Sequence, residues 1–367
     1  MVFICDTTLR DGEQAAGVAF STQEKCAIAR MLDGIGVHEI EAGTPVMGGD
    51  EAEAVRAVAS MGLNARVMAW NRAVITDIRA SVQAGVSAVA VSLPASDLMV
   101  QRKLGRDRAW VLARLKDAIG YAKDRELYVC AGAEDASRAD MDFLVEYAGI
   151  ARECGADRLR FADTVGVLDP FRMFMKIRAL SEAVDMPVEA HAHNDFGLAT
   201  ANALAGARGG AAYISTTVLG IGERAGNAAL EEVVMALKHL DGTDPGIKTE
   251  GLRRLCEYVA LSSGRAIPGG KPVVGGAVFC HESGIHADGV LKASEIYEPY
   301  GPEEVGAIRE IMLGKHSGRN GLMRRLSDLG IEVSGYEAGV LLGKVKEMGT
   351  RLKRPVNDRE LLTLCGA

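Results

Sequence analysis

Two histidines near the middle of the chain have the spacing of a metal site. They lie in the segment Val188–Asp195, which predicts a short strand. Side chains at positions i and i+2 of a strand share one face, so Glu189, His191 and His193 should point together. Two imidazoles at a strand end need only a carboxylate to form a divalent metal site. A polar rim, in which the histidines bond to backbone groups, explains the same short pattern.

A second polar segment, Asp6–Gln14, follows the first β-rich run and has the sequence DTTLRDGEQ. A loop after a strand is a usual place for catalytic groups, and Arg10 and Asp11 offer a cation and a carboxylate. The alternative is a capped helix start with Thr8 or Asp11 as N-cap. General propensities favour that alternative when the segment is taken by itself.

Short β-rich runs recur through the first two-thirds of the chain and alternate with amphipathic helical patterns such as Gln23–Leu32, Glu51–Ala59 and Trp110–Lys123. This alternation predicts parallel β/α units, and eight of them predict an α/β fold of the (β/α)8 TIM barrel type. The predicted strands are Val2–Asp6, Val37–Ala42, Arg66–Trp70, Ala88–Pro94, Leu127–Gly132, Arg158–Asp163, Pro187–His193 and Tyr213–Val218.

Polar residues gather at the carboxyl ends of these predicted strands, which is the face where barrel enzymes place their chemistry. An open doubly wound sheet is the alternative fold, but its usual G-x-G-x-x-G turn is absent after the first strand. The polar residues at strand ends are Asp6, Glu41, Ser92, Asp163, Thr164, His191, His193, Thr216 and Thr217.

The pattern changes near residue 260, where glycine- and proline-rich turns such as Pro268-Gly269-Gly270 begin. We therefore expect a catalytic barrel at 1–260 and a smaller, mainly helical C-terminal region at 261–367. Three helices are predicted in that region, over Gly318–Leu329, Tyr336–Glu347 and Asp358–Leu364.

Composition limits the function classes. The net charge of −7 disfavours a nucleic-acid partner, and no apolar run is long enough to cross a membrane. The seven cysteines are scattered and odd in number, which is typical of a reducing compartment. No basic, apolar leader stands at the start of the sequence. We expect a cytoplasmic enzyme with neither nucleic acid nor membrane as partner.

Three motifs together carry a family resemblance: Asp6–Gln14, the strand histidines and Gly220–Asn227, which has the sequence GIGERAGN. In this order they closely resemble the DRE-TIM metallolyase family of Claisen-condensing acyltransferases and related lyases. The resemblance covers nearly the full length. Within the family, the phrases Ser92–Met99, Glu134–Asp140 and Arg160–Val167 are most similar to homocitrate synthases, in particular the nitrogen-fixation type.

This resemblance implies a condensation of acetyl-CoA with 2-oxoglutarate and water to homocitrate and CoA, for the iron–molybdenum cofactor of nitrogenase. It also implies a homodimer whose C-terminal region covers the partner's active site. The alternatives are 2-isopropylmalate or citramalate synthesis, a carbon–carbon lyase of the HMG-CoA lyase type, and a binding protein that has lost turnover.

The resemblance also implies residue roles around a divalent metal ion, for which Zn²⁺, Mn²⁺ and Mg²⁺ fit the ligand types equally. The implied metal ligands are Asp11, His191, His193 and Asn227. The implied catalytic residues are Arg10 for developing charge on oxygen, Glu134 near the acetyl group, and His286 as general base accompanied by Tyr297.

For substrate binding, the resemblance implies Arg10 and Thr164, with the glycines Gly220, Gly222 and Gly226 near CoA. One position departs from the family pattern. Lysine-pathway homocitrate synthases have an arginine near the end of strand five, where this chain has Cys130. A distal carboxylate buried without a cationic partner is costly. Arg72 and Arg138 are therefore candidates for this role.

Overall fold

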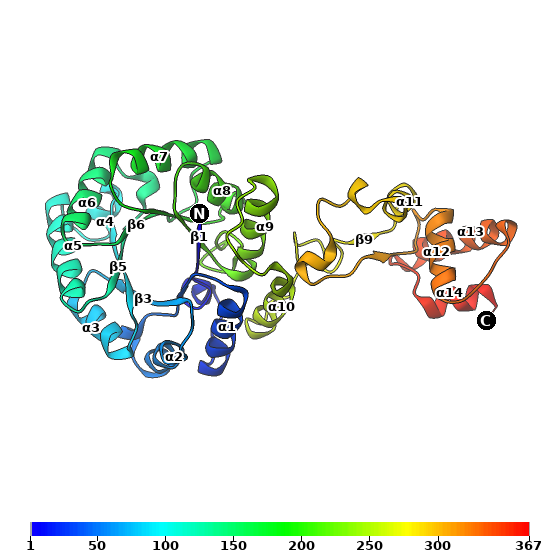
Figure 1. Ribbon diagram of the computed structural model, residues 1–367, viewed down its shortest axis with the longest axis horizontal. Helices are drawn as coiled ribbons and strands as arrows, with labels where there is room; N and C mark the ends of the chain where they lie inside the picture. The colour runs from blue at the N-terminus through cyan, green and yellow to red at the C-terminus, as the bar shows by residue number, and fades with distance from the viewer. Residues whose placement is uncertain (1, 367) are drawn as a thin grey trace. The chain divides into compact units, whose positions relative to one another are not determined.

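The computed structural model describes residues 2–366, and the first two-thirds of the chain form a closed barrel of eight parallel strands in sequence order. Figure 1 shows this ring of strands surrounded by helices. Strand β8 closes the barrel by pairing with β1. The strands are β1 (Phe3–Asp6), β2 (Glu39–Glu41), β3 (Arg66–Arg72), β4 (Ala88–Pro94), β5 (Tyr128–Glu134), β6 (Arg158–Asp163), β7 (Val188–Ala192) and β8 (Tyr213–Thr216).

The predicted α/β barrel is confirmed, and all eight strands lie at the predicted places with ends shifted by a few residues. A helix or helices follow each strand and cover the outside of the barrel, as parallel connections require. The helices of this unit are α1 (Thr22–Ile35), α2 (Gly49–Ala59), α3 (Ile75–Ala84), α4 (Asp97–Arg102), α5 (Arg108–Lys123), α6 (Met141–Glu153), α7 (Pro170–Ala183), α8 (Ala199–Arg208), α9 (Leu230–Leu240) and α10 (Leu252–Ser262), with a 3-10 turn, η1 (Gly12–Gln14), after β1.

Helix α1 shows how local sequence sets these elements. Ser21 accepts a hydrogen bond from the backbone of Glu24, and the Glu24 side chain bonds back to Ser21, which is a capping box. Gly36 ends the helix in a left-handed conformation that glycine adopts without steric cost. Ile28 and Leu32 lie four residues apart and are fully buried against the barrel.

Ion pairs fill the deeper part of the barrel interior. Arg158 is fully buried, with Nε 2.7 Å from Glu189 and a second pairing to Glu39. Arg160 lies between Glu189 and Glu41 at 2.7 and 2.8 Å. Buried charges are tolerated only when they are paired and hydrogen-bonded. The barrel floor is therefore polar rather than apolar.

Residues from Ile267 onward form a second compact unit. Its three predicted C-terminal helices are present within a few residues of their expected ends. Within residues 2–366 no helix has the length and apolar character that a membrane crossing requires. The strands and α-helices of this unit are β9 (Cys280–His281), β10 (Glu310–Ile311), α11 (Gly284–Lys292), α12 (Arg319–Asp328), α13 (Gly335–Leu352) and α14 (Asp358–Cys365).

Candidate active site

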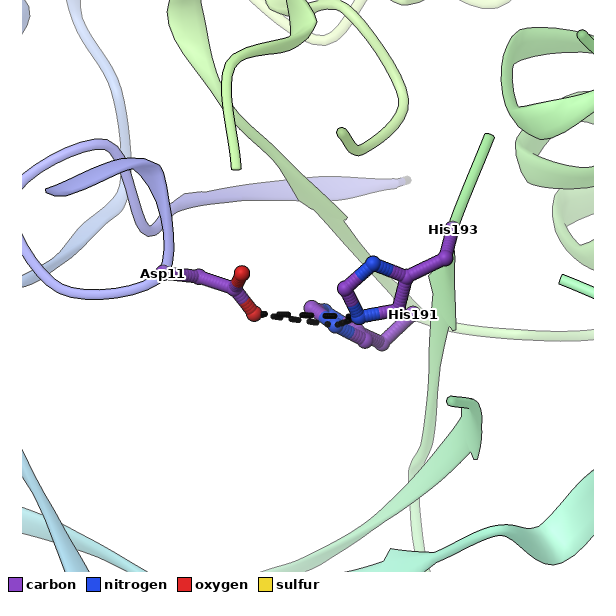
Figure 2. Close-up of side chains that lie close together, drawn as sticks. All are labelled: Asp11, His191 and His193. Atoms are coloured by element: carbon purple, nitrogen blue, oxygen red, sulfur yellow. Dashed lines mark hydrogen bonds and ion pairs between the residues drawn. The ribbon is translucent and has the colours of Figure 1, made fainter. Parts of the chain in front are cut away.

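Asp11, His191 and His193 converge inside the barrel. Figure 2 shows the carboxylate of Asp11 and the two imidazole rings pointing toward one another. The Nε2 atoms of the histidines lie 3.2 Å apart, and Oδ2 of Asp11 lies 3.4 Å from His191 Nε2 and 3.9 Å from His193 Nε2. Atoms that bind one ion at about 2.1 Å are separated by about 3 Å. All three residues are buried.

The backbone and two hydrogen bonds hold the histidine rings in place. His191 lies on β7, and His193 follows the strand and forms an isolated bridge to Asn227. Nδ1 of His191 lies 2.8 Å from the hydroxyl of Ser215. Nδ1 of His193 lies 3.2 Å from the carbonyl of Gly226, to which it donates. This donation leaves Nε2 of His193 as a lone-pair donor directed at the centre of the group.

Asn227 adjoins the same group. Its Nδ2 donates to Oδ1 of Asp11 and to the carbonyl of Ile221, both at 3.2 Å. Its Oδ1 is buried and has no hydrogen-bond partner among the described residues. An orphaned buried amide oxygen beside a carboxylate and two imidazoles fits a divalent ion, because such oxygen atoms are ordinary metal ligands.

Two glycines bring the loop after β8 close to this group. A Cβ at Gly222 would lie 2.2 Å from Asn227 Nδ2 and 3.2 Å from Asp11 Oδ1. Gly226 has φ of 95°, and a Cβ there would lie 1.9 Å from the carbonyl oxygen of Gly220. The glycines of this motif therefore have a packing role, which was not predicted from the sequence. They are not among the residues that line the adjacent cavity.

The local charges favour the protonation states that a cation needs. Burial opposes ionisation of Asp11, but Arg10 and the two histidines outweigh it and hold the pKa of Asp11 well below its usual value. Burial and the neighbouring His191 lower the pKa of His193 to about 4, which keeps this imidazole neutral. Burial also opposes ionisation of Glu41, but Arg10 and Arg160 lower its pKa to about 2.

A cavity of about 260 Å³ opens beside the three residues at the carboxyl ends of the strands. It has several cationic groups in its wall, together with small side chains that leave room for a ligand. The lining residues are Arg10, Asp11, Gln14, Trp70, Ala90, Ser92, Gly132, Ala133, Glu134, Arg160, Ala162, Thr164, His191, His193, Glu223 and Arg224.

Three residues to which the family resemblance gives a role, Arg10, Thr164 and Glu134, lie in this wall beside the metal-ligand candidates. Arg10 contacts Oδ2 of Asp11 at 3.1 Å through Nη1, and its Nε pairs with Glu41. The hydroxyl of Thr164 accepts a hydrogen bond from the backbone of Asp135 at 2.8 Å, so its own proton is available to a ligand. Glu134 pairs with Lys103 through both carboxylate oxygens, at 2.6 and 2.9 Å.

The structure does not bring Arg72 and Arg138 to the cavity. Arg72 is exposed and bonded to both carboxylate oxygens of Asp77, and Arg138 is bonded to Asp135. Cys130 is fully buried below the cavity, with Sγ 3.4 Å from Glu189. Since strand side chains alternate, the position on β5 that lines the cavity above Cys130 is Gly132.

Ser92, which was predicted at the carboxyl end of its strand, lines the cavity, whereas Trp70, Arg160 and Arg224 line it without having been predicted. The alternation along β6 carries a usable signal, because Arg160 lies four residues before Thr164 and therefore on the same face. Arg224 is bonded to Asp195 through Nε and Nη2, at 2.8 and 2.9 Å, at the exposed rim.

His286 and Tyr297 belong to the second unit, where they lie against each other. His286 is exposed on α11, and the ring centroids of the pair are 4.2 Å apart. A separate histidine in this unit, His281, is buried and bonded to Glu298 at 2.9 Å, and Arg309 braces that carboxylate. Of His281 and His286, only the exposed His286 can be reached by a ligand from outside the unit.

A closed (β/α)8 barrel with a polar cavity at the carboxyl ends of its strands is the architecture of the TIM-barrel enzymes. Comparison with known proteins identifies the family. Residues 1–259 match the family described as HMGL-like, and the chain belongs to this family. Residues 273–353 match a domain described as homocitrate synthase post-HMGL domain-like. The predicted resemblance to the DRE-TIM metallolyases is confirmed.

Individual relatives carry different names at similar identity. A 2-isopropylmalate synthase 2 from Caldanaerobacter subterraneus subsp. tengcongensis is 53% identical over 99% of this chain and 94% of its own length. Homocitrate synthase 1 from Nostoc sp. is 51% identical over 99% of this chain and 96% of its own length. The resemblance to homocitrate synthases is therefore confirmed, and the names of the relatives do not agree on one product.

A solved structure supports the fold. The HMG-CoA lyase of Bacillus subtilis superposes with a TM-score of 0.66 over 73% of this chain and 95% of its own. The two sequences are 20% identical. At this identity the likeness concerns the barrel architecture alone.

Proposed function

We propose that the protein is a homocitrate synthase, which condenses acetyl-CoA with 2-oxoglutarate and water and releases homocitrate and CoA. The observation that carries the proposal is the buried group of Asp11, His191 and His193, with Arg10 and Thr164 in the same cavity wall. This arrangement offers a cation site, an oxyanion donor and a hydroxyl donor within one small volume.

Asp11, His191 and His193 would hold the divalent ion, with Asn227 adjoining them. The ion, which Zn²⁺, Mn²⁺ and Mg²⁺ fit equally by ligand type, would supply Lewis acidity to the ketone of the oxoacid. The orphaned Oδ1 of Asn227 supports this assignment, because a bound cation would satisfy it. The low pKa of His193, caused by burial, supports it as well.

The chain's own groups then orient the oxoacid and stabilise charge. Arg10 is buried, is held by Glu41 and faces the group beside Asp11, so it can donate to the oxygen on which negative charge develops. The hydroxyl of Thr164 can donate to the carboxylate next to the ketone. Glu134 lies in the wall near the place proposed for the acetyl group.

His286 is proposed as the general base that removes a methyl proton from acetyl-CoA, with Tyr297 against its ring. The resulting carbanion forms the new carbon–carbon bond to the ketone carbon, and water then cleaves the thioester. We propose that His286 reaches the cavity of a second copy, so that the C-terminal region at 261–367 forms a homodimer over the partner's barrel.

Exposed apolar side chains support this dimer. They follow β2, β3, β4, β6 and β7 along the chain, on the side of the barrel where the strands end, and a monomer would leave them in water. The second unit, which contains His286, also has exposed apolar residues. The residues of the barrel are Met47, Val74, Leu98, Phe171 and Phe196, and those of the second unit are Ile285, Ile296 and Ile308.

The relatives that carry the name homocitrate synthase support 2-oxoglutarate as substrate, and one of them, from Frankia alni, is 49% identical. The three arginines in the cavity wall, Arg10, Arg160 and Arg224, are the groups that could pair with the carboxylates of a dicarboxylate. The proposed product would serve the iron–molybdenum cofactor of nitrogenase. The Caldanaerobacter relative favours 2-isopropylmalate synthesis as the second candidate, in which 2-oxoisovalerate replaces 2-oxoglutarate.

A thiol-release assay with purified protein, acetyl-CoA and a panel of 2-oxoacids tests the proposal. We expect the fastest CoA release with 2-oxoglutarate. A preference for 2-oxoisovalerate or pyruvate would move the function to 2-isopropylmalate or citramalate synthesis. Cleavage of 3-hydroxy-3-methylglutaryl-CoA, tested in parallel, would indicate a lyase.

A further inference from the structure

Arg160 is a buried guanidinium in the wall of the cavity, with 5% of the residue exposed. It lies on β6, where Arg160, Ala162 and Thr164 recur at every second position and share the inward face. Arg160 pairs in register with Gly132 on β5 and with Glu189 on β7. It therefore lies below Thr164 at the deep end of the cavity.

Two carboxylates hold Arg160 but leave part of its guanidinium free. Its Nε donates to Glu189 at 2.7 Å, and its Nη2 lies 2.8 Å from Glu41. Within residues 2–366 its Nη1 donates no hydrogen bond. A guanidinium has five N–H donors in a planar fork, and the two on Nη1 remain available to an anion.

Small residues keep the space above Arg160 open. Ala90, Ser92, Gly132 and Ala162 all line the cavity. A Cβ at Gly132 would lie 3.3 Å from Ser92, so even alanine would press on the neighbouring strand. The polar end of Arg160 can thus be reached from the cavity rather than being covered by its neighbours.

The register of the strands sets the distance between the two ends of this cavity. His191 pairs with Ala162, one inward layer above Arg160. Two residues along a strand span about 6.6 Å. A ligand whose ketone carbon is held near His191 would therefore reach Arg160 through two methylene groups, a carboxylate and one hydrogen bond.

We infer that Arg160 binds the distal carboxylate of a dicarboxylic 2-oxoacid and so selects 2-oxoglutarate, an inference that rests on the proposed function. The other two cationic groups of the wall are differently placed. Arg10 is engaged by Asp11 and Glu41 beside the metal-ligand candidates, and Arg224 lies at the exposed rim. A monocarboxylic 2-oxoacid would place an apolar end against Arg160 and leave the buried N–H groups of Arg160 without a partner. This cost disfavours monocarboxylic oxoacids.

Steady-state kinetics of an Arg160→Gln variant tests this inference with two substrates, 2-oxoglutarate and 2-oxopentanoate, which has a methyl group in place of the distal carboxylate. We expect the KM for 2-oxoglutarate to rise on the order of 10- to 100-fold. The value of kcat/KM for 2-oxopentanoate should stay level or rise. If Arg160 had only a structural role, the substitution would lower kcat/KM for both substrates by the same factor.

Two further variants sharpen the comparison. Arg160→Lys keeps a charge inside the barrel, guards against a folding failure of the neutral variant and should restore part of the preference for 2-oxoglutarate. Arg178→Gln, at an exposed position on α7, is the matched control and should behave as wild type. Circular dichroism and melting temperature show whether each variant is folded.

The outcomes separate this inference from the proposed function. If wild type itself prefers a monocarboxylic oxoacid, the proposed function fails before any variant is considered. If wild type prefers 2-oxoglutarate and both Arg160 variants keep the wild-type ratio of kcat/KM between the two substrates, the role of Arg160 is overturned and the function stands. The role of Arg160 would also be overturned if the ratio of kcat/KM changed in Arg72→Gln or Arg138→Gln and not in the Arg160 variants.

Discussion

Asn227 donates a hydrogen bond from Nδ2 to Oδ1 of Asp11 at 3.2 Å, across 216 residues of sequence. Asp11 follows the first strand and Asn227 follows the last, so closure of the barrel by the β1–β8 pairing brings them together. Both residues are buried. The bond orients the carboxylate toward His191 and His193, and thereby links the integrity of the fold to the geometry of the proposed metal site.

The first prediction concerns Gly222, whose substitution should disturb this contact. In Gly222→Ala the new Cβ would lie 2.2 Å from Asn227 Nδ2 and displace it from Asp11. We expect metal affinity to fall by about 10- to 100-fold, the usual effect of losing a group that orients a ligand. The measurement is metal content against chelator concentration.

A matched control is Gly197→Ala, because Gly197 also has positive φ and a Cβ at this position would meet nothing within 4 Å. Its free energy of unfolding should fall by about 1–2 kcal/mol, because alanine is strained in the left-handed conformation, and its metal affinity should stay unchanged. Equal metal affinities in the two variants would contradict the role given to Gly222.

The second prediction concerns the ligands themselves. A His191→Ala/His193→Ala double variant should lose most bound metal and nearly all activity, because two of the three ligand side chains disappear. Circular dichroism should show an intact barrel. Elemental analysis of the purified variant provides the measurement, and stoichiometric metal in it would refute the assignment.

The third prediction tests whether one active site is shared by two chains. His286→Ala should bind metal and 2-oxoglutarate but fail in proton abstraction, whereas Asp11→Ala should fail through its metal site. Mixing the two inactive proteins under subunit exchange should restore activity, since one site in each hybrid has both groups intact. Hybrids that form but stay inactive would show that His286 does not serve a partner's barrel.

The fourth prediction concerns pH. Burial, opposed by the hydrogen bonds from Thr8 and aided by the charge of Glu231, raises the pKa of Asp6 to about 7. The unfolded value is about 3.9, so between about pH 4 and 7 the folded state holds a proton that the unfolded state releases. The stabilising contribution of protonated Asp6 is complete below about pH 4 and is lost as the pH rises through 7.

Urea unfolding across this range measures the effect. Asn cannot ionise, so the midpoint of wild type should fall relative to that of Asp6→Asn as the pH rises from about 4 to 7. Asp185→Asn, at an exposed position, should follow the wild-type curve. Parallel curves for wild type and Asp6→Asn would show that Asp6 does not titrate in this window.

Local sequence determined the barrel, because each β/α unit depends on short-range patterns. The apolar run Ala88–Pro94 predicts a buried strand, and the Ser21 and Glu24 capping pair begins α1. The two-residue spacing of His191 and His193 likewise places both rings on one face without knowledge of the rest of the chain. The resemblance of whole motifs added Asp11 and Asn227, which no local pattern joins to the histidines.

Only the tertiary structure decided which arginine reaches the cavity. Arg72, Arg138 and Arg160 all lie on or just after strands, and sequence reasoning chose the first two. Arg72 and Arg138 are instead bonded to neighbouring aspartates outside the cavity, whereas Arg160 faces inward between Glu41 and Glu189. The direction of a long charged side chain depends on partners from other strands, and the register of the closed barrel alone brings those partners together.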